Sequence, residues 1–438
     1  MNEIFIKAVQ LILSLSIIVI LHELGHFIPA RIFKTRVEKF YLFFNPWFSL
    51  FKKKIGETVY GIGWLPLGGY IKISGMIDES MDVEQMKKDP EPWEFRSKPA
   101  WQRIIIMLGG VTVNIILGFV IYMIIMFVWG KNVLSSESLP MGLNPSPIIQ
   151  ELGFEKGDQI ISVDGKKLDN VLDINTYMFL RDIKTIVAKN KEGVTKNLNI
   201  PKKIGERMFE SGQMIAFTPI IAAIIDSVTP NSSAMSAGLK KGDVFKKVDG
   251  IEIEDWGLFK EKIKSKKNQN LNVEIERNKR RIEISLKTNE IGQIGVYIQT
   301  PFISFNNKKL SLSESIVEGF KYGYWTLHDY VYQFKYIFTK KGAQQLGGIG
   351  TIGSIFPSSW NWKGFWHTTA LLSIILAFMN VLPIPALDGG HVMFLFYEII
   401  SGKKPNDKFM EYAQMFGFFL LLALVLYANG NDIYRAFF

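Results

Sequence analysis

Apolar and polar residues alternate along this chain in long blocks, and four apolar blocks are candidates for membrane spans. They cover residues 4–27, 104–129, 368–400 and 415–427. A bilayer core about 30 Å thick takes about 20 apolar residues in a helix, and the fourth block reaches this length with its flanks. The third contains Pro383, Pro385 and the pair Gly389-Gly390, which break or loosen a helix. A broken helix is tolerated at membrane depth where it faces protein or a wet cavity.

Basic residues gather in the short loops that flank these blocks. The first block is long and no small-residue cleavage site follows it, so we expect a retained span rather than a signal peptide. Lysine and arginine follow the first block, precede the second and separate the third from the fourth, at 31–54, 98–103 and 403–408. The positive-inside rule predicts that these loops are cytoplasmic. Both termini and the region 131–367 are then expected on the opposite side.

The region between the second and third blocks contains an internal repeat. Each copy has a glycine, a Gly-Asp pair and a Val-Asp-Gly turn at identical spacing. They stand at Gly153, Gly157-Asp158 and Val163-Asp164-Gly165 in the first copy, and at Gly238, Gly242-Asp243 and Val248-Asp249-Gly250 in the second. Asp-Gly between apolar strands is a hairpin signal, and the alternation at 272–276 predicts another strand. We therefore expect two similar small α+β domains in tandem, at 131–216 and 217–300.

Two further segments follow the repeats, within 301–367. Residues 311–339 predict an aromatic-rich amphipathic helix, which lies on the membrane surface or packs on the second repeat domain. Residues 346–355 (LGGIGTIGSI) are glycine-rich and apolar, and predict a re-entrant or close-packed segment.

Composition agrees with a protein that mixes membrane helices with soluble domains. Of its 438 residues 48% are hydrophobic, and the formal net charge is +10. Basic residues beside spans suit anionic lipid head groups, and no nucleic-acid motif is present, so no nucleic-acid partner is expected. The chain has no cysteine and five histidines. A metal ion would therefore be held by histidine and carboxylate side chains.

The first apolar block carries His22-Glu23-Leu24-Gly25-His26. On a helix His22 and His26 share one face, where two imidazoles can bind one Zn²⁺. Glu23 lies beside them and could take a proton from a water on the metal. Ionisable residues at membrane depth are costly and mark function by default. A chance match and a structural zinc site are the alternatives.

A catalytic zinc site has three protein ligands and one open position. Asp388 is the only acidic residue between Thr368 and Phe396, and a lone carboxylate in an apolar span is expensive unless it is paired or bound to a metal. Asp388 is therefore the favoured third ligand. The alternatives are that it caps a half-helix that begins near Gly389, or that His391 is the ligand. His328 and His367 are expected to be ordinary interface residues.

These motifs together resemble the site-2 protease family of intramembrane zinc metalloproteases. The resemblance rests on HELGH in the first span, NVLPIPALDGGH in the third and two tandem repeats that resemble PDZ domains, and it covers nearly the whole chain. It implies a multi-pass membrane protein with four helical spans, a membrane-associated β-loop, and two α+β PDZ-like domains between spans two and three. The implied segments are 1–30, 31–103 with the β-loop at 58–75, 104–130, 131–216, 217–300, 301–367, 368–400 and 410–430.

The resemblance also implies roles for particular residues. It makes His22, His26 and Asp388 the ligands of one Zn²⁺ per chain, and Glu23 the catalytic glutamate. It makes Asn380 a residue that holds the substrate backbone, with a helix–helix hydrogen bond as the alternative. The β-loop, through a hairpin at Gly68, Gly69 and Tyr70, is implied to contact substrate. Asn114 belongs to a GGxxxN pattern whose small residues allow close helix packing.

The chain departs from the family in two places. Gly348-Ile349-Gly350 stands where Gly-Pro is usual, and the first repeat has a short segment at 145–152 without the usual Ala-Gly. The implied function is cleavage of pre-trimmed single-span membrane proteins, of the anti-sigma-factor or signal-peptide-remnant type, in the bacterial inner membrane. The PDZ-like domains are then periplasmic and filter substrates or bind peptide tails. A catalytically inactive PDZ-containing scaffold and a zinc transporter are the rival functions.

Overall fold

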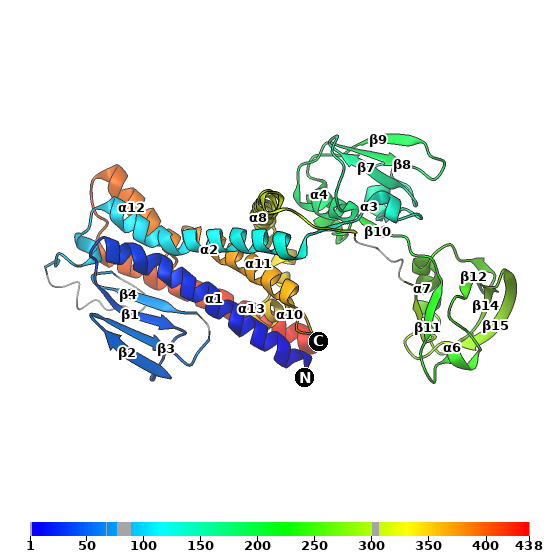
Figure 1. The fold of residues 1–438 in the computed structure, drawn as a ribbon, viewed down its shortest axis with the longest axis horizontal. Helices are drawn as coiled ribbons and strands as arrows, with labels where there is room; N and C mark the ends of the chain where they lie inside the picture. Colours follow the sequence, from blue (N-terminus) through cyan, green and yellow to red (C-terminus); the bar gives the residue numbers. More distant parts are fainter. Residues whose placement is uncertain (1, 67, 77–88, 300–305, 438) are drawn as a thin grey trace. The chain divides into compact units, whose positions relative to one another are not determined.

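The structure is a computed structural model that describes residues 2–66, 68–76, 89–299 and 306–437. It divides into two compact units (Figure 1). The first unit joins Met1–Gly130 to Lys309–Phe438, and the second is Lys131–Lys308. Each unit is described by itself. The expected boundary between the second repeat domain and the following segment, at 300–301, lies outside the described residues.

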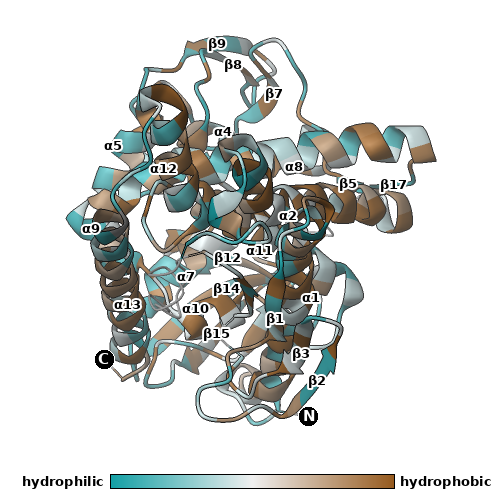
Figure 2. Ribbon diagram, turned by 90° about the vertical axis from the view of Figure 1, so that its left-hand side faces the viewer, coloured by the Kyte–Doolittle hydropathy of each residue, from teal (hydrophilic) through white to brown (hydrophobic). Residues whose placement is uncertain are grey.

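Among the described residues, four helices of the first unit are long and apolar enough to cross a membrane, the number of spans that the sequence predicts. They are α1 (Glu3–Ile32), α2 (Ala100–Trp129), α11 (Trp362–Val381) and α13 (Asp407–Phe437). Figure 2 shows them coloured as predominantly hydrophobic ribbons. A helix of 30 residues, such as α1, is about 45 Å long, which exceeds the hydrocarbon thickness of a bilayer.

Helix α2 is the centre of this unit, and it packs against α1, α8, α11 and α12. Glycines let α1 and α2 approach closely. A Cβ atom on Gly25 would lie 2.8 Å from the Cα of Gly110, and one on Gly109 would lie 2.7 Å from the carbonyl carbon of Gly25. The close packing expected from the small residues of the second span is thus confirmed. It brings the HELGH turn of α1 against Gly109 and Gly110 in the N-terminal half of α2.

The third apolar segment is broken where its prolines predict. Helix α11 ends at Val381, and α12 (Asp388–Ser401) begins after a loop that contains Pro383 and Pro385. A Cβ on Gly390 would lie 2.5 Å from the carbonyl oxygen of Ile384, so glycine is needed where this loop folds back on the start of α12. The main-chain N–H of Ala386, whose φ is 76°, donates to the Gln414 side chain of α13 at 2.5 Å.

A four-stranded sheet lies between α1 and α2 in the chain. Its strands are β1 (Val37–Leu42), β2 (Phe51–Ile55), β3 (Thr58–Ile62) and β4 (Tyr70–Ile73), in the spatial order β2-β3-β1-β4. The 3₁₀ turn η2 (Phe95–Ser97) follows it. Figure 1 shows the sheet beside α1, and both β1 and β4 contact that helix.

The predicted hairpin at Gly68-Gly69-Tyr70 is wrong, because β1 lies between β3 and β4. Strand β1 pairs in parallel with β3 and antiparallel with β4. Gly69 is small for a different reason: a Cβ there would lie 2.6 Å from Val19 of α1 and 2.7 Å from the carbonyl oxygen of Tyr41. Its lack of a side chain therefore allows close contact between the sheet and α1, rather than a tight turn.

The segment after the second unit forms α8 (Leu312–Phe334), the 3₁₀ turn η5 (Lys335–Phe338), α9 (Lys340–Gln345) and α10 (Ile349–Ser354). The predicted aromatic-rich helix is α8, and it begins with a capping box between Ser311 and Glu314. It packs on α2 through Gly319 and Gly323, where added Cβ atoms would meet Met123 and Phe119.

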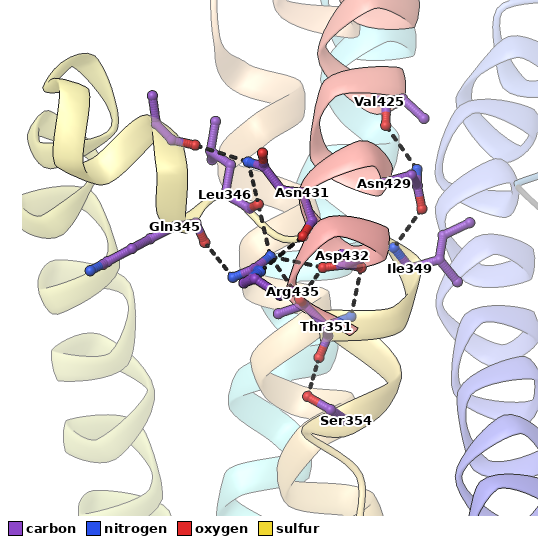
Figure 3. A network of polar contacts seen from close by, with 11 residues as sticks. Gln345, Leu346, Ile349, Thr351, Ser354, Val425, Asn429, Asn431, Asp432 and Arg435 are labelled. Atoms are coloured by element: carbon purple, nitrogen blue, oxygen red, sulfur yellow. Dashed lines mark hydrogen bonds and ion pairs between the residues drawn. The ribbon is translucent and has the colours of Figure 1, made fainter. Parts of the chain in front are cut away.

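The glycine-rich segment is close-packed against the last helix (Figure 3). A Cβ on Gly348 would lie 2.8 Å from the Cα of Asn429. The main-chain N–H of Thr351 donates to Asp432 at 2.9 Å, and Arg435 pairs with Asp432 at 2.8 Å. These contacts fasten α10 to the C-terminal end of α13.

The second unit contains two separate apolar cores. The first core is covered by the sheet β7-β8-β9, the pair β6-β10 and three helices. These elements are β6 (Leu143–Pro145), α3 (Pro147–Gln150), β7 (Gln159–Val163), α4 (Ile174–Leu180), β8 (Thr185–Lys189), β9 (Thr195–Asn199), α5 (Ile204–Ser211) and β10 (Phe217–Pro219), with the 3₁₀ turns η3 (Ser136–Ser138) and η4 (Val171–Asp173).

The second core is covered by the sheet β13-β12-β14-β15 and the pair β11-β16. These elements are β11 (Ile225–Val228), α6 (Ser233–Ser236), β12 (Val244–Val248), β13 (Ile251–Glu252), α7 (Trp256–Lys264), β14 (Asn270–Arg277), β15 (Arg280–Lys287) and β16 (Val296–Ile298). The strand expected at 272–276 lies within β14. Strands β5 (Lys131–Val133) and β17 (Asn306–Lys308) pair at the two ends of the unit.

The repeated aspartates accept equivalent main-chain hydrogen bonds in the two repeats. Asp164 and Asp249 have φ values of 46° and 47°, and each accepts a main-chain N–H from a neighbouring strand, Thr185 and Asn272 respectively, at 2.8 Å. The Gly-Asp aspartates, Asp158 and Asp243, each accept the N–H three residues earlier, at 2.9 and 2.8 Å. The repeat is therefore explained by turn chemistry.

Candidate metal centre

Three side chains from two distant segments converge in the first unit. His22 and His26 come from α1, and Asp388 is the first residue of α12. Their ligand atoms all lie within 4.8 Å of one another. The two Nε2 atoms are 3.3 Å apart, and each lies 3.4 Å from Oδ2 of Asp388. Among the described residues this is the one group of three or more such side chains that could hold a metal ion.

The local structure explains how each group reaches the site. Helix α1 is continuous through the HELGH turn, so His22 and His26 lie on one face, a turn apart. The proline-containing loop places Asp388 at the start of α12. The N-cap of that helix is Leu387, and no side-chain capping bond is made. The carboxylate of Asp388 is therefore directed to the histidines, and the capping alternative is wrong.

The spacing of these atoms fits a tetrahedral ion. Ligands at about 2.0–2.1 Å from Zn²⁺ in tetrahedral geometry lie about 3.3 Å from one another, close to the three distances above. Oδ2 of Asp388 is buried and makes no hydrogen bond among the described residues, which is costly for an ionised oxygen unless a cation is bound. The residues present therefore fit a zinc ion.

Gly110 of α2 leaves space for such an ion. A Cβ on Gly110 would lie against Nε2 of His26, and 2.6 and 2.8 Å from Cε1 and Nδ1 of His22. Any larger side chain would occupy the region between the two imidazoles. The glycine pair of the second span therefore serves the site as well as helix packing.

His26 is held in the tautomer that a metal requires. Its Nδ1 lies 2.8 Å from the main-chain carbonyl oxygen of Ile106, and only a protonated nitrogen can donate to that oxygen. Nε2 then carries the lone pair that faces Asp388 and His22. This carbonyl partner was missed at the sequence level, because a backbone acceptor has no sequence signature.

Glu23 is buried beside this group, with 7% of its surface exposed. The start of β4 approaches it closely, since a Cβ on Gly69 would lie 3.6 Å from Cγ of Glu23. Tyr70 is directed elsewhere, and its hydroxyl donates to Oδ1 of Asn45 at 2.9 Å. Gly68 lies against the ring of Phe44, since a Cβ on Gly68 would lie 3.1 Å from Cε2 of that ring. Of the three expected loop residues, Gly69 is thus the one placed against Glu23.

Asn380 of α11 also reaches the group. Its Nδ2 lies 3.3 Å from Nε2 of His22, on the side of the imidazole that faces the ligand atoms. The amide is half-buried and therefore borders the centre. Asn114 lies on the opposite side of the same ring, with Nδ2 3.1 Å from Nδ1 of His22.

The other histidines are outside the metal-ligand group. His391 lies 2.9 Å from Nε2 of Gln414, which also holds the loop before Asp388. His328 pairs with Asp329 at 3.1 Å, and His367 contacts the hydroxyl of Tyr322 at 2.8 Å. Gln414 was missed at the sequence level, because it stands just before the apolar block 415–427 and nothing in the sequence relates it to the loop before Asp388.

A His-His-carboxylate group with an adjacent buried glutamate, set among apolar helices, defines a membrane protein of the HExxH metal-site class. The family model described as peptidase family M50 matches residues 10–424. The chain belongs to peptidase family M50.

Curated relatives match the chain from end to end. A putative zinc metalloprotease of Campylobacter jejuni is 27% identical over 98% of this chain and 94% of its own length. The regulator of sigma E protease of Haemophilus influenzae is 26% identical over 97% of this chain and 98% of its own length. The regulator of sigma-E protease RseP of Escherichia coli is 25% identical over 97% of each chain.

Among solved structures, a PDZ domain from Listeria monocytogenes covers 19% of this chain and 92% of its own, with 18% identity and a TM-score of 0.18. A similarity at this level says nothing about the fold of the repeat domains.

Proposed function

We propose that this protein is an intramembrane zinc metalloprotease that hydrolyses peptide bonds in membrane-spanning segments. One observation carries the proposal: three ligand atoms 3.3–3.4 Å apart lie beside a buried glutamate, and the two histidines and the glutamate lie on a helix apolar enough to span a membrane. His22, His26 and Asp388 hold one Zn²⁺ per chain. Family membership and the names of the relatives support this assignment.

The roles of the surrounding residues follow from their positions. A zinc ion in this group supplies Lewis acidity, which activates water and polarises the scissile carbonyl. Glu23 takes the proton of the attacking water and delivers it to the leaving nitrogen. Asn380, at 3.3 Å from Nε2 of His22, donates its amide hydrogens to the substrate backbone beside the scissile bond.

The substrate reaches the site as an extended strand. A membrane helix shields its peptide bonds, so it must unwind before cleavage, and its freed backbone groups then need partners. Strand β4 is the end strand of the sheet, and within the described ranges β1 is the strand that pairs with it. Addition of the substrate along β4 satisfies its backbone. The chain then passes Gly69, which lies against Glu23.

The physiological substrates that fit this arrangement are single-span proteins already trimmed by another protease. The anti-sigma-factor and signal-peptide-remnant types follow from the family resemblance. The two PDZ-like domains lie on the periplasmic side of a bacterial inner membrane, where they exclude bulky substrates or bind peptide tails. Basic short loops support this orientation, because they are retained on the cytoplasmic side.

The test is Glu23→Gln in proteoliposomes with a helical single-span reporter. We expect cleavage to fall by about 100-fold or more, since a general base contributes about 10²–10⁴-fold, while zinc content stays at the parent level. Glu3→Gln is the matched control, because Glu3 lies on the same helix with 59% of its side chain exposed.

Two results would contradict the proposal. Cleavage by Glu23→Gln at the parent rate would remove the proposed mechanism. A parent protein that binds zinc but leaves the reporter intact would favour an inactive scaffold. Asp388→Asn should lower zinc content, and an unchanged content would remove Asp388 from the ligand group.

A further inference from the structure

Asn114 is a buried amide whose hydrogen bonding is inconsistent with a metal ligand at His22. None of its surface is exposed. Its Nδ2 lies 3.1 Å from Nδ1 of His22, and its Oδ1 is buried with no hydrogen-bond partner among the described residues. A buried amide oxygen without a donor is costly.

The orientation of this amide determines where the His22 proton lies. If Nδ2 donates to Nδ1, the neutral imidazole must carry its hydrogen on Nε2. That atom lies 3.4 Å from Oδ2 of Asp388 and 3.3 Å from Nε2 of His26. A protonated Nε2 has no lone pair for a metal ion, so this arrangement disables one of the three ligands.

A half-turn of the side-chain amide about its terminal bond removes the conflict at His22 and places Nδ2 where Oδ1 now lies. Oδ1 then faces Nδ1 of His22 and accepts its hydrogen, and Nε2 is left with its lone pair in the centre. The shape of the amide is nearly unchanged by this rotation. The hydroxyl of Ser373 of α11 donates to the main-chain carbonyl of Asn114 at 2.8 Å, a contact that does not involve the side-chain amide.

We infer that Asn114 is a positioning residue: its amide oxygen accepts the Nδ1 hydrogen of His22 and fixes the tautomer that binds zinc. The main-chain carbonyl of Ile106 does the same for His26 at 2.8 Å. Helix α2 thus sets the proton position on both imidazoles. The inference rests on the proposed zinc site and assigns Asn114 a role beyond the close packing of small residues.

The zinc affinity of Asn114 variants distinguishes a hydrogen-bonding role of this residue from a packing role. The purified full chain is stripped of metal, and Zn²⁺ is titrated against a competing chelator. Asn114→Leu keeps the approximate size of the side chain but removes the acceptor, and we expect affinity to fall about 10–100-fold, as for other partners of ligating histidines. Asn114→Asp keeps an acceptor oxygen, and we expect affinity within about threefold of the parent, well short of that loss.

Ser373→Ala is the matched control, because it alters the same buried contact without removing the acceptor for His22. It should retain parent affinity. Equal affinity in Asn114→Leu and the parent, or an equal loss in the leucine and aspartate variants, would overturn the inference. Failure of the parent itself to bind zinc would instead remove the proposed function.

A spectroscopic readout tests the tautomer directly in the metal-free protein. Nitrogen NMR of isotope-labelled histidine distinguishes protonated from unprotonated ring nitrogens, and His22→Gln assigns the His22 signals. We expect a protonated Nδ1 and an unprotonated Nε2 in the parent and in Asn114→Asp, and a mixture of both tautomers in Asn114→Leu. An unprotonated Nδ1 in the parent would overturn the inference.

Discussion

Ile106, Gly110 and Asn114 recur at intervals of four residues on α2 and so lie on one helix face. This face meets both imidazoles of α1. Ile106 contributes a carbonyl, Asn114 an amide, and Gly110 between them contributes empty space. At this face, the absence of a side chain at Gly110 matters as much as the hydrogen-bonding groups of Ile106 and Asn114.

Gly110→Ala tests the importance of that space. The added methyl group would lie 2.6 Å from Cε1 of His22 and against Nε2 of His26, so the two rings cannot keep their spacing. We expect loss of most bound zinc, measured by elemental analysis of the purified protein. Gly430→Ala is the matched control in α13, where an added Cβ meets nothing within 4 Å. Full zinc content in Gly110→Ala would contradict the assigned geometry.

At the scale of elements, α12 is short, and its N-terminal residue is the carboxylate of the centre. Its position depends on contacts at both ends. The loop before it is held by Gln414 of α13, and Glu398 near its C-terminal end pairs with Arg103 of α2 at 2.5 Å. Arg103 is buried and Glu398 is partly buried, with 8% and 15% of their side chains exposed. This largely desolvated pair joins the C-terminal part of α12 to α2.

Removal of one partner from this pair should be costly. Arg103→Met leaves an uncompensated carboxylate, and we expect the free energy of unfolding to fall by about 3–5 kcal/mol. The double variant Arg103→Met with Glu398→Leu should recover most of this loss, because no buried charge is left. Stability is measured by denaturant titration in detergent micelles.

A matched control comes from an exposed pair in the same unit. Lys7 and Glu3 are 3.0 Å apart on α1, and Lys7→Met should change stability by about 1 kcal/mol or less. A double variant as unstable as Arg103→Met would show that packing around α12, and not the charge pair, carries the stability.

At the scale of the whole molecule, the helices that could cross a membrane and the small α+β cores belong to different units of the chain. All four candidate spans belong to the first unit, and both independent α+β cores belong to the second. The metal group lies wholly within the first unit. The second unit has its own buried residues and its own sheets, which is the property of a domain that folds alone.

Residues 131–308 expressed alone should therefore give a soluble, folded protein. We expect cooperative unfolding in urea and strand-rich circular dichroism. Aggregated or unfolded material would show that this unit depends on the first for its stability.

The pH dependence of that fragment follows from Asp249. The Lys266 ammonium and the main-chain N–H of Asn272 bond its carboxylate and hold its pKa below the usual value of 3.8. A lowered folded-state pKa stabilises the fold above pH 3.8, and this contribution is lost as the pH falls through the lowered value. Asp249→Asn should destabilise the fragment at pH 7, and the difference from the parent should shrink toward pH 3. A difference independent of pH would contradict this.

The sequence by itself determined which segments are apolar, where the third one breaks and which residue types can bind a metal. These properties are local: hydropathy, proline and glycine act within a few residues. His22 and His26 share a helix face for the same reason. The tandem aspartates also predicted their own turns, because each bonds the backbone a few residues away or on a neighbouring strand.

Only the tertiary structure decided which distant groups meet. Asp388 joins the histidines because the broken segment packs against α1 and α2, which its spacing along the chain does not specify. Strand β1 separates β3 from β4, so a glycine pair that predicted a turn serves a close contact instead. Ile106, Gly110 and Asn114 acquire their roles through the same packing. Their carbonyl, missing side chain and amide affect the site only because α2 places them against His22 and His26.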